Sequence, residues 1–290
     1  MKTVLITGKT GYVSRNILNW LKATPEKYSC ESLSIRSESW NAVDLSKYDT
    51  IIHAAAMVHQ REKKANVNIY KLINTDLTYK LANKAKHSGV KHFIFISSMS
   101  VYGLDGKIGR PVVISADTPC TPSSFYGKSK LEAENLIFGL QDSKFTISIV
   151  RPPMIYGPNC PGNYSKLRKL AINWSLFPDI QNERSMIFID NLCIVLEKLI
   201  SSSTPGIFLP QNTEFVSTSE MIRLIAEQHG KKTIFSKVLG RAICLFNIAA
   251  FNKIYGNLTY KKLPSMLQLE KSCIIGFEES MHITEKEWES

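Results

Sequence analysis

A glycine-rich turn close to Met1 constrains the fold of this chain more than any other feature. The run Lys2–Thr7 is rich in β-branched residues, and Gly8-Lys9-Thr10-Gly11 follows it directly. Apolar residues then recur at helical spacing. A strand, a glycine turn and a helix in this order bring the backbone close to a pyrophosphate, which sits at the helix N-terminus. Ser14 stands where the usual pattern has its third glycine. We therefore expect a dinucleotide to contact Gly8, Thr10, Gly11, Tyr12 and Val13.

Strand and helix patterns alternate over the first half of the chain. We expect strands at 2–7, 33–36, 50–53, 92–96 and 145–150, and long helices at 68–88 and 126–140. Apolar strands that alternate with amphipathic helices predict an α/β fold with a doubly wound parallel sheet of the Rossmann type. Prolines and glycines interrupt this pattern after Val150, and Met186–Ile189 indicates one more strand that returns to the sheet.

The change of pattern predicts two parts. Residues 1–158 form a dinucleotide-binding domain, to which 186–203 return. Residues 159–185 and 204–290 form a smaller substrate-binding region. Within that region, 238–251 is apolar with Arg241 inside it. We expect an amphipathic helix that packs against the core, with peripheral contact to a membrane surface as the alternative.

Composition and charge exclude several classes of protein. Of the 290 residues 44% are hydrophobic and 21% are charged, as in an ordinary globular protein. No apolar run is long enough to span a membrane, so we expect a cytoplasmic protein. The net charge of +11 indicates either an anionic partner or a solvated basic surface. No nucleic-acid-binding motif is present. The six cysteines are scattered without a C-x-x-C pair, which predicts reduced thiols and no metal site.

The residues after the second expected strand select the cofactor. An acid at this place binds the ribose hydroxyl of NAD, whereas an arginine accommodates the phosphate of NADP. This chain has Ser34-Ile35-Arg36-Ser37, so Arg36 favours NADP(H). Glu38 follows closely and keeps NAD(H) possible. The alternative is that Arg36 is a solvent-exposed residue that contributes only to solubility.

A tyrosine and a lysine at the start of the second long helix predict a catalytic pair. Tyr126 and Lys130 are four residues apart and therefore share one helix face. A lysine cation lowers the pKa of a nearby phenol, which can then exchange a proton with a carbonyl or alcohol oxygen. The buried strand 92–96 ends in hydroxyl residues, at the sheet edge where such folds bind ligands. We expect Ser98 to hydrogen-bond the same substrate oxygen.

Together these motifs resemble the extended short-chain dehydrogenase/reductase superfamily, in its NAD-dependent epimerase/dehydratase branch. The resemblance covers roughly the first two hundred residues and includes the turn Arg151-Pro152-Pro153-Met154-Ile155-Tyr156-Gly157-Pro158. It implies a catalytic triad of Ser98, Tyr126 and Lys130. It implies further cofactor contacts from Asp44, Leu45, Ala54, Ala55, Ala56, Asn74, Lys130 and Pro153. It implies a nucleotide-diphospho-sugar substrate bound by Ser98, Tyr126, Met154, Asn163 and Arg184, and a homodimer formed through the two long helices.

Three reactions share this machinery. Dehydratases of the branch carry an acid pair where this chain has Ser98-Met99-Ser100, so dehydration is not expected. The stretch 150–164 resembles bacterial capsule-pathway 4-ketoreductases, and Arg36 and the short chain agree with that. The resemblance implies NAD(P)H-dependent reduction of UDP-N-acetyl-4-keto-6-deoxyhexosamine to UDP-N-acetyl-fucosamine or -quinovosamine. A UDP-sugar 4-epimerase with bound NAD is the alternative. A non-catalytic NADP(H)-binding sensor is a remote alternative, because such proteins typically lose the tyrosine or the lysine.

Overall fold

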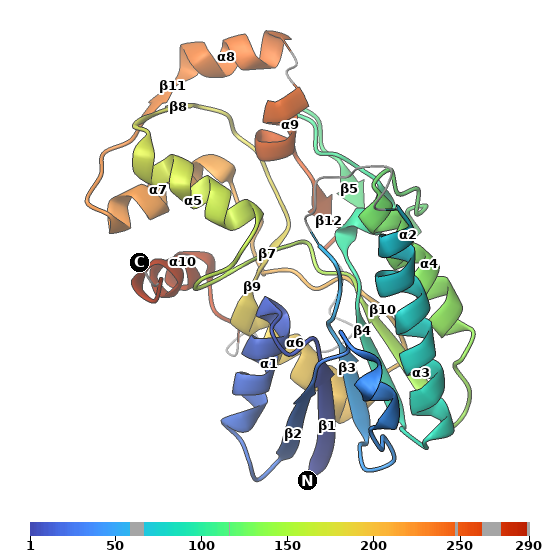
Figure 1. Ribbon diagram of the computed structural model, residues 1–290. Coiled ribbons are helices and arrows are strands. Elements are labelled where there is room, and N and C mark those ends of the chain that lie inside the picture. Colours follow the sequence, from blue (N-terminus) through green and yellow to red (C-terminus); the bar gives the residue numbers. More distant parts are fainter. Residues whose placement is uncertain (59–66, 116, 247–248, 263–273, 289–290) are drawn as a thin grey trace. The chain divides into compact units, whose positions relative to one another are not determined.

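The computed structural model describes residues 1–58, 67–115, 117–246, 249–262 and 274–288, and its central feature is a six-stranded parallel sheet (Figure 1). The strand order is β10-β6-β4-β3-β1-β2. The strands are β1 (Lys2–Thr7), β2 (Tyr28–Leu33), β3 (Thr50–His53), β4 (His92–Ile96), β6 (Thr146–Val150) and β10 (Gly206–Phe208). The order reverses beside β1, because β2 lies on one side of it and β3 on the other. This confirms the doubly wound α/β prediction, and it places a topological switch point at the carboxyl ends of β1 and β3.

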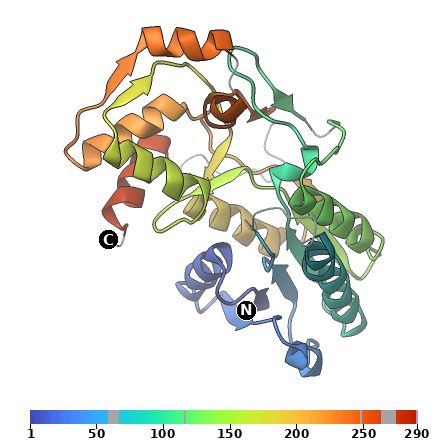
Figure 2. The same cartoon turned by 45° about the horizontal axis from the view of Figure 1, so that its top comes forward.

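Helices cover both faces of this sheet (Figures 1 and 2). One face carries α1 (Tyr12–Lys22) and the part of α6 (Ile189–Ser202) from Cys193 onward. The other carries α3 (Leu77–His87) and α4 (Phe125–Phe138). Strand residues alternate between the faces. Leu5, Ile51, Phe93 and Ile147 are buried in the cluster that includes Leu81, Ala85, Ala133 and Ile137 of α3 and α4.

Two expected strands are placed differently in the structure. The second strand is Tyr28–Leu33, not 33–36, and it pairs only with β1 at the edge of the sheet. Its polar residues Ser29, Glu31 and Ser32 hide it from a search for apolar runs, since an edge strand is only half buried. The strand at Met186–Phe188, β9, does not return to the central sheet. It pairs with β7 (Met154–Tyr156), and β10 is the returning strand instead.

The long helix expected at 68–88 is interrupted inside. It consists of α2 (Val67–Tyr70), a π-helical segment η3 (Lys71–Asp76) and then α3. Such π segments are rare and often accompany functional sites. The second long helix, α4, begins at Phe125 and ends at Phe138, close to the expected 126–140.

The chain divides into two compact units. The first contains the six-stranded sheet and comprises Met1–Gly103, Pro119–Pro152 and Cys193–Pro210. The second comprises Leu104–Thr118, Pro153–Leu192 and Gln211–Ser290. The boundary at Pro152 precedes the expected one at 158, and the returning segment Cys193–Pro210 overlaps the expected 186–203 but begins and ends later. That the units bind a dinucleotide and a substrate, respectively, stays a prediction.

The second unit contains short elements around its own helices. Its strands are β5 (Val113–Ile114), β7, β8 (Leu176–Pro178), β9, β11 (Ile234–Ser236) and β12 (Thr259–Tyr260), paired as β7-β9, β8-β11 and β5-β12. Its helices are α5 (Asn163–Asn173), α7 (Thr218–Gln228), α8 (Lys237–Phe246), α9 (Ala249–Tyr255) and α10 (Phe277–Lys286). Helix α7 packs against both α5 and α10. The single helix expected at 238–251 is therefore two, and residues 247–248 between them lie outside the described part. No helix in the described ranges is long and apolar enough to cross a membrane.

A buried ion pair ties α4 to the end of β6. The Arg151 guanidinium donates to Glu134 through Nε (3.1 Å to Oε1) and Nη2 (2.5 Å to Oε2), and both side chains are almost fully buried. The Ser97 hydroxyl also donates to Glu134, and Arg151 Nη1 donates to the Tyr102 hydroxyl at 2.9 Å. The network therefore joins α4 to the segments that follow β4 and β6, where the candidate catalytic residues lie.

Replacing Glu134 with alanine should destabilise the protein strongly. The substitution leaves the Arg151 cation buried without its carboxylate, which costs about 3–5 kcal/mol of unfolding free energy. Urea denaturation of the two proteins measures the difference. The matched control is Glu132→Ala on the same helix, whose carboxylate is half exposed and lies 3.7 Å from Lys71 Nζ. It should cost less than about 1 kcal/mol. Equal losses in both variants would contradict this account of the pair.

Candidate active site

The glycine turn after β1 opens into a cavity of about 520 Å³, a volume typical of small-ligand sites. Gly8 has φ of +91°, and a Cβ there would lie 2.9 Å from the Ala55 Cα, so the turn can approach the β3 end only without a side chain. Ser14, in the place of the third glycine, donates to the Thr7 carbonyl at 3.0 Å. It therefore fastens α1 to β1. Helix α1 begins after Gly11 with no acid in its first turn and no side-chain cap, which fits a pyrophosphate at its positive end.

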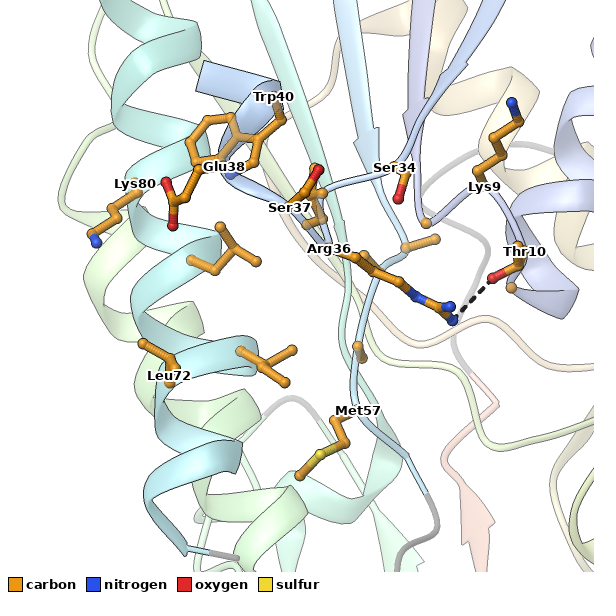
Figure 3. A pocket seen from close by; sticks show the side chains of 18 residues that line it. Lys9, Thr10, Ser34, Arg36, Ser37, Glu38, Trp40, Met57, Leu72 and Lys80 are labelled. Atoms are coloured by element: carbon orange, nitrogen blue, oxygen red, sulfur yellow. Dashed lines mark hydrogen bonds between the residues drawn. The ribbon is translucent and has the colours of Figure 1, made fainter. Parts of the chain in front are cut away.

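Charged side chains of both signs line this cavity (Figure 3). Arg36 extends toward the glycine turn, where its Nη2 donates to the Thr10 hydroxyl at 3.1 Å. Glu38 points the other way, toward the side where Lys80 lies, and accepts from Asn41 Nδ2 at 2.6 Å. Lys9 also lines the cavity. The arginine, and not the acid, therefore faces the glycine turn.

The cavity contains only some of the predicted cofactor residues. Gly8, Thr10, Gly11, Arg36, Ala54, Ala55 and Ala56 line it. Tyr12, Val13, Asp44, Leu45, Asn74, Lys130 and Pro153 do not line it. Asp44 is exposed and accepts from the backbone N–H and hydroxyl of Ser46, while Leu45 is buried in the apolar core. The prediction that these two contact adenine stays untested. Sequence reasoning missed Lys9, which lies inside the glycine turn, and Trp40, Met57, Leu72 and Lys80, which come from segments without a motif.

Buried polar contacts fix the wall of the cavity formed by 54–57. Asn74, in the π-helical segment, accepts from the Met57 N–H at 2.8 Å and donates to the Ser129 hydroxyl of α4 at 3.1 Å. The His53 side chain lies between Thr7 Oγ1 (2.7 Å from Nδ1) and Thr78 Oγ1 (2.8 Å from Nε2). Thr78 gives its own proton to the Asn74 carbonyl, so His53 must carry its proton on Nε2. Burial lowers the pKa of His53 to about 3, and the ring therefore stays neutral.

Ser98 and Tyr126 lie together beyond the end of β4. A side-chain hydrogen bond joins the Ser98 hydroxyl to the Tyr126 phenol. Ser98 Oγ also accepts from the Ser100 N–H at 3.1 Å, so its own proton can be donated. Helix α4 begins at Phe125, capped by Ser124, whose hydroxyl accepts from the Gly127 N–H. This cap sets Tyr126 in the first turn of the helix. Ser98, after the end of β4, and Tyr126, at the start of α4, therefore lie next to each other.

Lys130 lies one turn after Tyr126 on α4 and is 1% exposed. Its Nζ donates to the Ile96 carbonyl at 2.8 Å and lies 4.4 Å from the centre of the Phe95 ring. Burial lowers the pKa of Lys130 to about 7, against the opposing effect of Glu134. Burial also raises the pKa of Tyr126 to about 12, although the Ser98 hydrogen bond lowers it. The lowered phenol pKa expected from the sequence is therefore not found in this state, because desolvation dominates both groups.

The predicted substrate residues outside the triad lie in the second unit. Met154 is in β7, Asn163 is the exposed first residue of α5, and Arg184 precedes β9. Arg184 Nη1 donates to the Gly256 carbonyl at 2.8 Å, and its backbone pairs with Val216. Burial lowers the pKa of Arg184, and the nearby Asp105 opposes this. Their role in substrate binding stays a prediction.

Comparisons with known proteins show the family and the fold of this chain. A family model described as the NAD dependent epimerase/dehydratase family matches residues 4–202. The UDP-glucose 4-epimerase of Vibrio cholerae is 30% identical over 276 residues, which cover 83% of each chain. The solved UDP-glucuronic acid 4-epimerase from Bacillus cereus, in complex with NAD, has a TM-score of 0.76 at 19% identity. The dTDP-4-dehydrorhamnose reductase from Bacillus anthracis, in complex with NADP, has a TM-score of 0.73 at 19% identity. Both alignments cover 98% of each chain and confirm the fold.

The burial of Lys130 should make stability depend on pH. In the unfolded chain this lysine keeps its proton up to its ordinary pKa of 10.5, whereas in the folded protein it releases the proton above about pH 7. Unfolding therefore takes up a proton between these values. The free energy of unfolding of the wild type, relative to Lys130→Met, should rise with pH by up to roughly 1.4 kcal/mol per pH unit. Urea denaturation of both proteins across this window measures the difference, and a difference independent of pH would contradict it.

Proposed function

We propose, from the premise that this chain belongs to the NAD dependent epimerase/dehydratase family, that it is an NADPH-dependent 4-ketoreductase of nucleotide sugars. The proposed substrate is a UDP-linked 4-keto-6-deoxy-N-acetylhexosamine, and the product is UDP-N-acetyl-fucosamine or -quinovosamine. The observation that carries the cofactor choice, and with it the reaction, is the direction of Arg36. Its guanidinium faces the glycine turn, and Glu38 points away from that turn (Figure 3).

The charges around the cavity support NADPH. Three cations line it, Lys9, Arg36 and Lys80, against one carboxylate, Glu38. A guanidinium binds a phosphate through paired, charge-assisted N–H donors, whereas a ribose hydroxyl offers it only a single neutral acceptor. A reductase must exchange its cofactor in each turnover, and an exposed arginine at the mouth of the cavity suits such exchange. An epimerase instead keeps its NAD.

The catalytic groups can perform the proton half of a ketone reduction. When bound, the nicotinamide supplies the hydride to the keto carbon. Tyr126 donates its phenol proton to the keto oxygen, and Ser98 donates a hydrogen bond to that oxygen, because Ser98 Oγ already accepts from the Ser100 N–H. Protonated Lys130 favours the phenolate that Tyr126 leaves behind. The cost of that phenolate in a buried site explains why a cation is needed one helical turn away.

A 4-epimerase is the second candidate. The Vibrio cholerae relative, which matches 83% of this chain, is named a UDP-glucose 4-epimerase. The same three residues would serve an epimerase, with oxidation and reduction at one sugar carbon. The two functions differ in whether the cofactor is consumed, and that difference decides the experiment.

The reductase should consume NADPH only when the keto sugar is present. A separate 4,6-dehydratase generates the substrate in the cuvette, and the loss of NADPH absorbance reports turnover. Tyr126→Phe should lower kcat by about 10²–10⁴-fold, because the keto oxygen loses its proton donor. The matched control is Tyr79→Phe on α3, a partly exposed tyrosine outside the site, which should keep full activity. No NADPH consumption, together with interconversion of UDP-sugar 4-epimers without added cofactor, would establish the epimerase instead.

Replacing Arg36 with alanine should separate the two cofactors. The loss of a charge-assisted contact to the phosphate should raise the Kd of NADPH by about 10–100-fold. The Kd of NADH should stay nearly unchanged. Trp40 lines the cavity, so titrations can follow tryptophan fluorescence. Arg15→Ala, an exposed arginine of α1 that does not line the cavity, is the control. A similar loss for both cofactors would contradict the assignment of Arg36 to the phosphate.

A further inference from the structure

Helix α8 presents apolar side chains to solvent. Val238 is 77% exposed, Leu245 is 83% exposed and Phe246 is 78% exposed. Val238, Arg241 and Leu245 follow one another at spacings of three and four and therefore share one helix face. The opposite side of α8 packs against the rest of the unit. Ile243 is buried, and a Cβ on Gly240 would lie 2.4 Å from the Asp179 carbonyl oxygen. The helix is thus held in place with an apolar face turned outward.

The same surface continues onto the strands beside α8. Leu176 of β8 and Ile234 of β11 are directly opposite each other in the parallel pair, and both are more than half exposed. Trp174, just before β8, is 64% exposed. Helix α8 packs on β8, and Figures 1 and 2 show it beside β8 and β11. We call the six residues Trp174, Leu176, Ile234, Val238, Leu245 and Phe246 the α8 surface.

The stretch of the chain that carries α8 is rich in cations and contains no acid. From 228 to 269 the sequence contains no Asp or Glu. The same stretch contains Lys231, Lys232, Lys237, Arg241, Lys253, Lys261 and Lys262. The first four of these are exposed. A hollow of about 490 Å³ beside α8 is lined by Arg241 and Leu245 and by a single carboxylate, Asp179.

We propose that the α8 surface docks on an anionic lipid bilayer. Interfacial helices place Leu, Phe and Trp at the boundary between headgroups and acyl chains and keep Lys and Arg at the phosphates. Lys237 and Arg241 lie on α8 itself, so its basic and apolar groups can meet the two layers of one leaflet together. The attraction of juxtamembrane cations to anionic lipid adds to the burial of the apolar side chains. This docking does not depend on which reaction the first unit catalyses.

Charge favours a bilayer over a second copy of this chain. A symmetric contact between two α8 surfaces would bring like cations together, which costs free energy in proportion to their proximity. A leaflet of anionic headgroups offers the opposite charge over the whole surface. The exposed cations and the apolar side chains of the α8 surface therefore both match an anionic bilayer.

Vesicle sedimentation of the full chain tests the proposal. The wild type should sediment with vesicles of phosphatidylcholine and phosphatidylglycerol, and at least tenfold less with phosphatidylcholine alone. Raising the salt from about 0.1 M to about 1 M should weaken binding, because the Debye length falls from about 10 Å to about 3 Å. The double variants Leu245→Ser/Phe246→Ser and Lys237→Glu/Arg241→Glu should each reduce the bound fraction about tenfold or more. Their melting curves should match the wild type, since all four side chains are exposed.

A matched control variant for the vesicle experiment is available in the second unit, which also contains α8. The double variant Leu104→Ser/Val113→Ser removes two other exposed apolar side chains and should bind vesicles as the wild type does. Equal losses in this control and in the α8 variants would overturn the proposal. Equal binding to neutral and anionic vesicles, or no binding to either, would also overturn it. Light scattering that shows a dimer, lost in Leu245→Ser/Phe246→Ser, without vesicle binding would assign the surface to self-association instead.

Discussion

Lys130 and Glu134 are two ionisable residues one helical turn apart on α4, and both are buried. The arrangement of the candidate catalytic groups depends on which neighbouring groups compensate these two charges. Glu134 is met by the Arg151 guanidinium and the Ser97 hydroxyl. Lys130 donates to the Ile96 carbonyl and lies over the face of Phe95, and it makes no ion pair among the described residues, although the charge of Glu134 acts on it. The carboxylate is therefore neutralised by a full ion pair, whereas the lysine is left partly unsatisfied. This imbalance makes the charge of Lys130 responsive to charge that develops nearby, as the proposed role of this lysine beside a tyrosinate requires.

Burial also shifts the pKa values of the two groups of the proposed mechanism in opposite directions. A phenol with its pKa raised to about 12 holds its proton, and a lysine with its pKa lowered to about 7 carries its charge only part of the time near neutrality. A proton donor to a ketone needs the first property. The lowered pKa of Lys130 means that negative charge brought close to its ammonium group would raise that pKa and stabilise the protonated lysine. The neutral His53 beside this site cannot take the same part, because Thr7 and Thr78 fix its one proton on Nε2.

The sequence was sufficient where local chemistry and position coincide. The glycine turn lies between a strand and a helix, and Tyr126 and Lys130 lie at a helix start, so both could be located from their spacing together with this context. Strand β2 could not be placed, because an edge strand needs apolar residues on only part of its surface. Strand β9 is as apolar as a central strand, yet it pairs with β7, and only tertiary context separates the two cases. The directions of the side chains could not be predicted from the sequence either. Arg36 and Glu38 are two residues apart, and the structure shows that Arg36 faces the glycine turn.

Both units carry a local excess of cations. In the first unit three cations line a cavity that is suited to phosphate groups. In the second unit cations border an apolar helix face, in a stretch of the chain without a single carboxylate from 228 to 269. The net charge of +11 is therefore not spread evenly along the chain. In the cavity the cations surround a concave site of ligand size, and on α8 they surround a convex helix with exposed Leu and Phe. The first geometry suits the small anion that we propose for the cavity, and the second suits the anionic bilayer that we propose for α8.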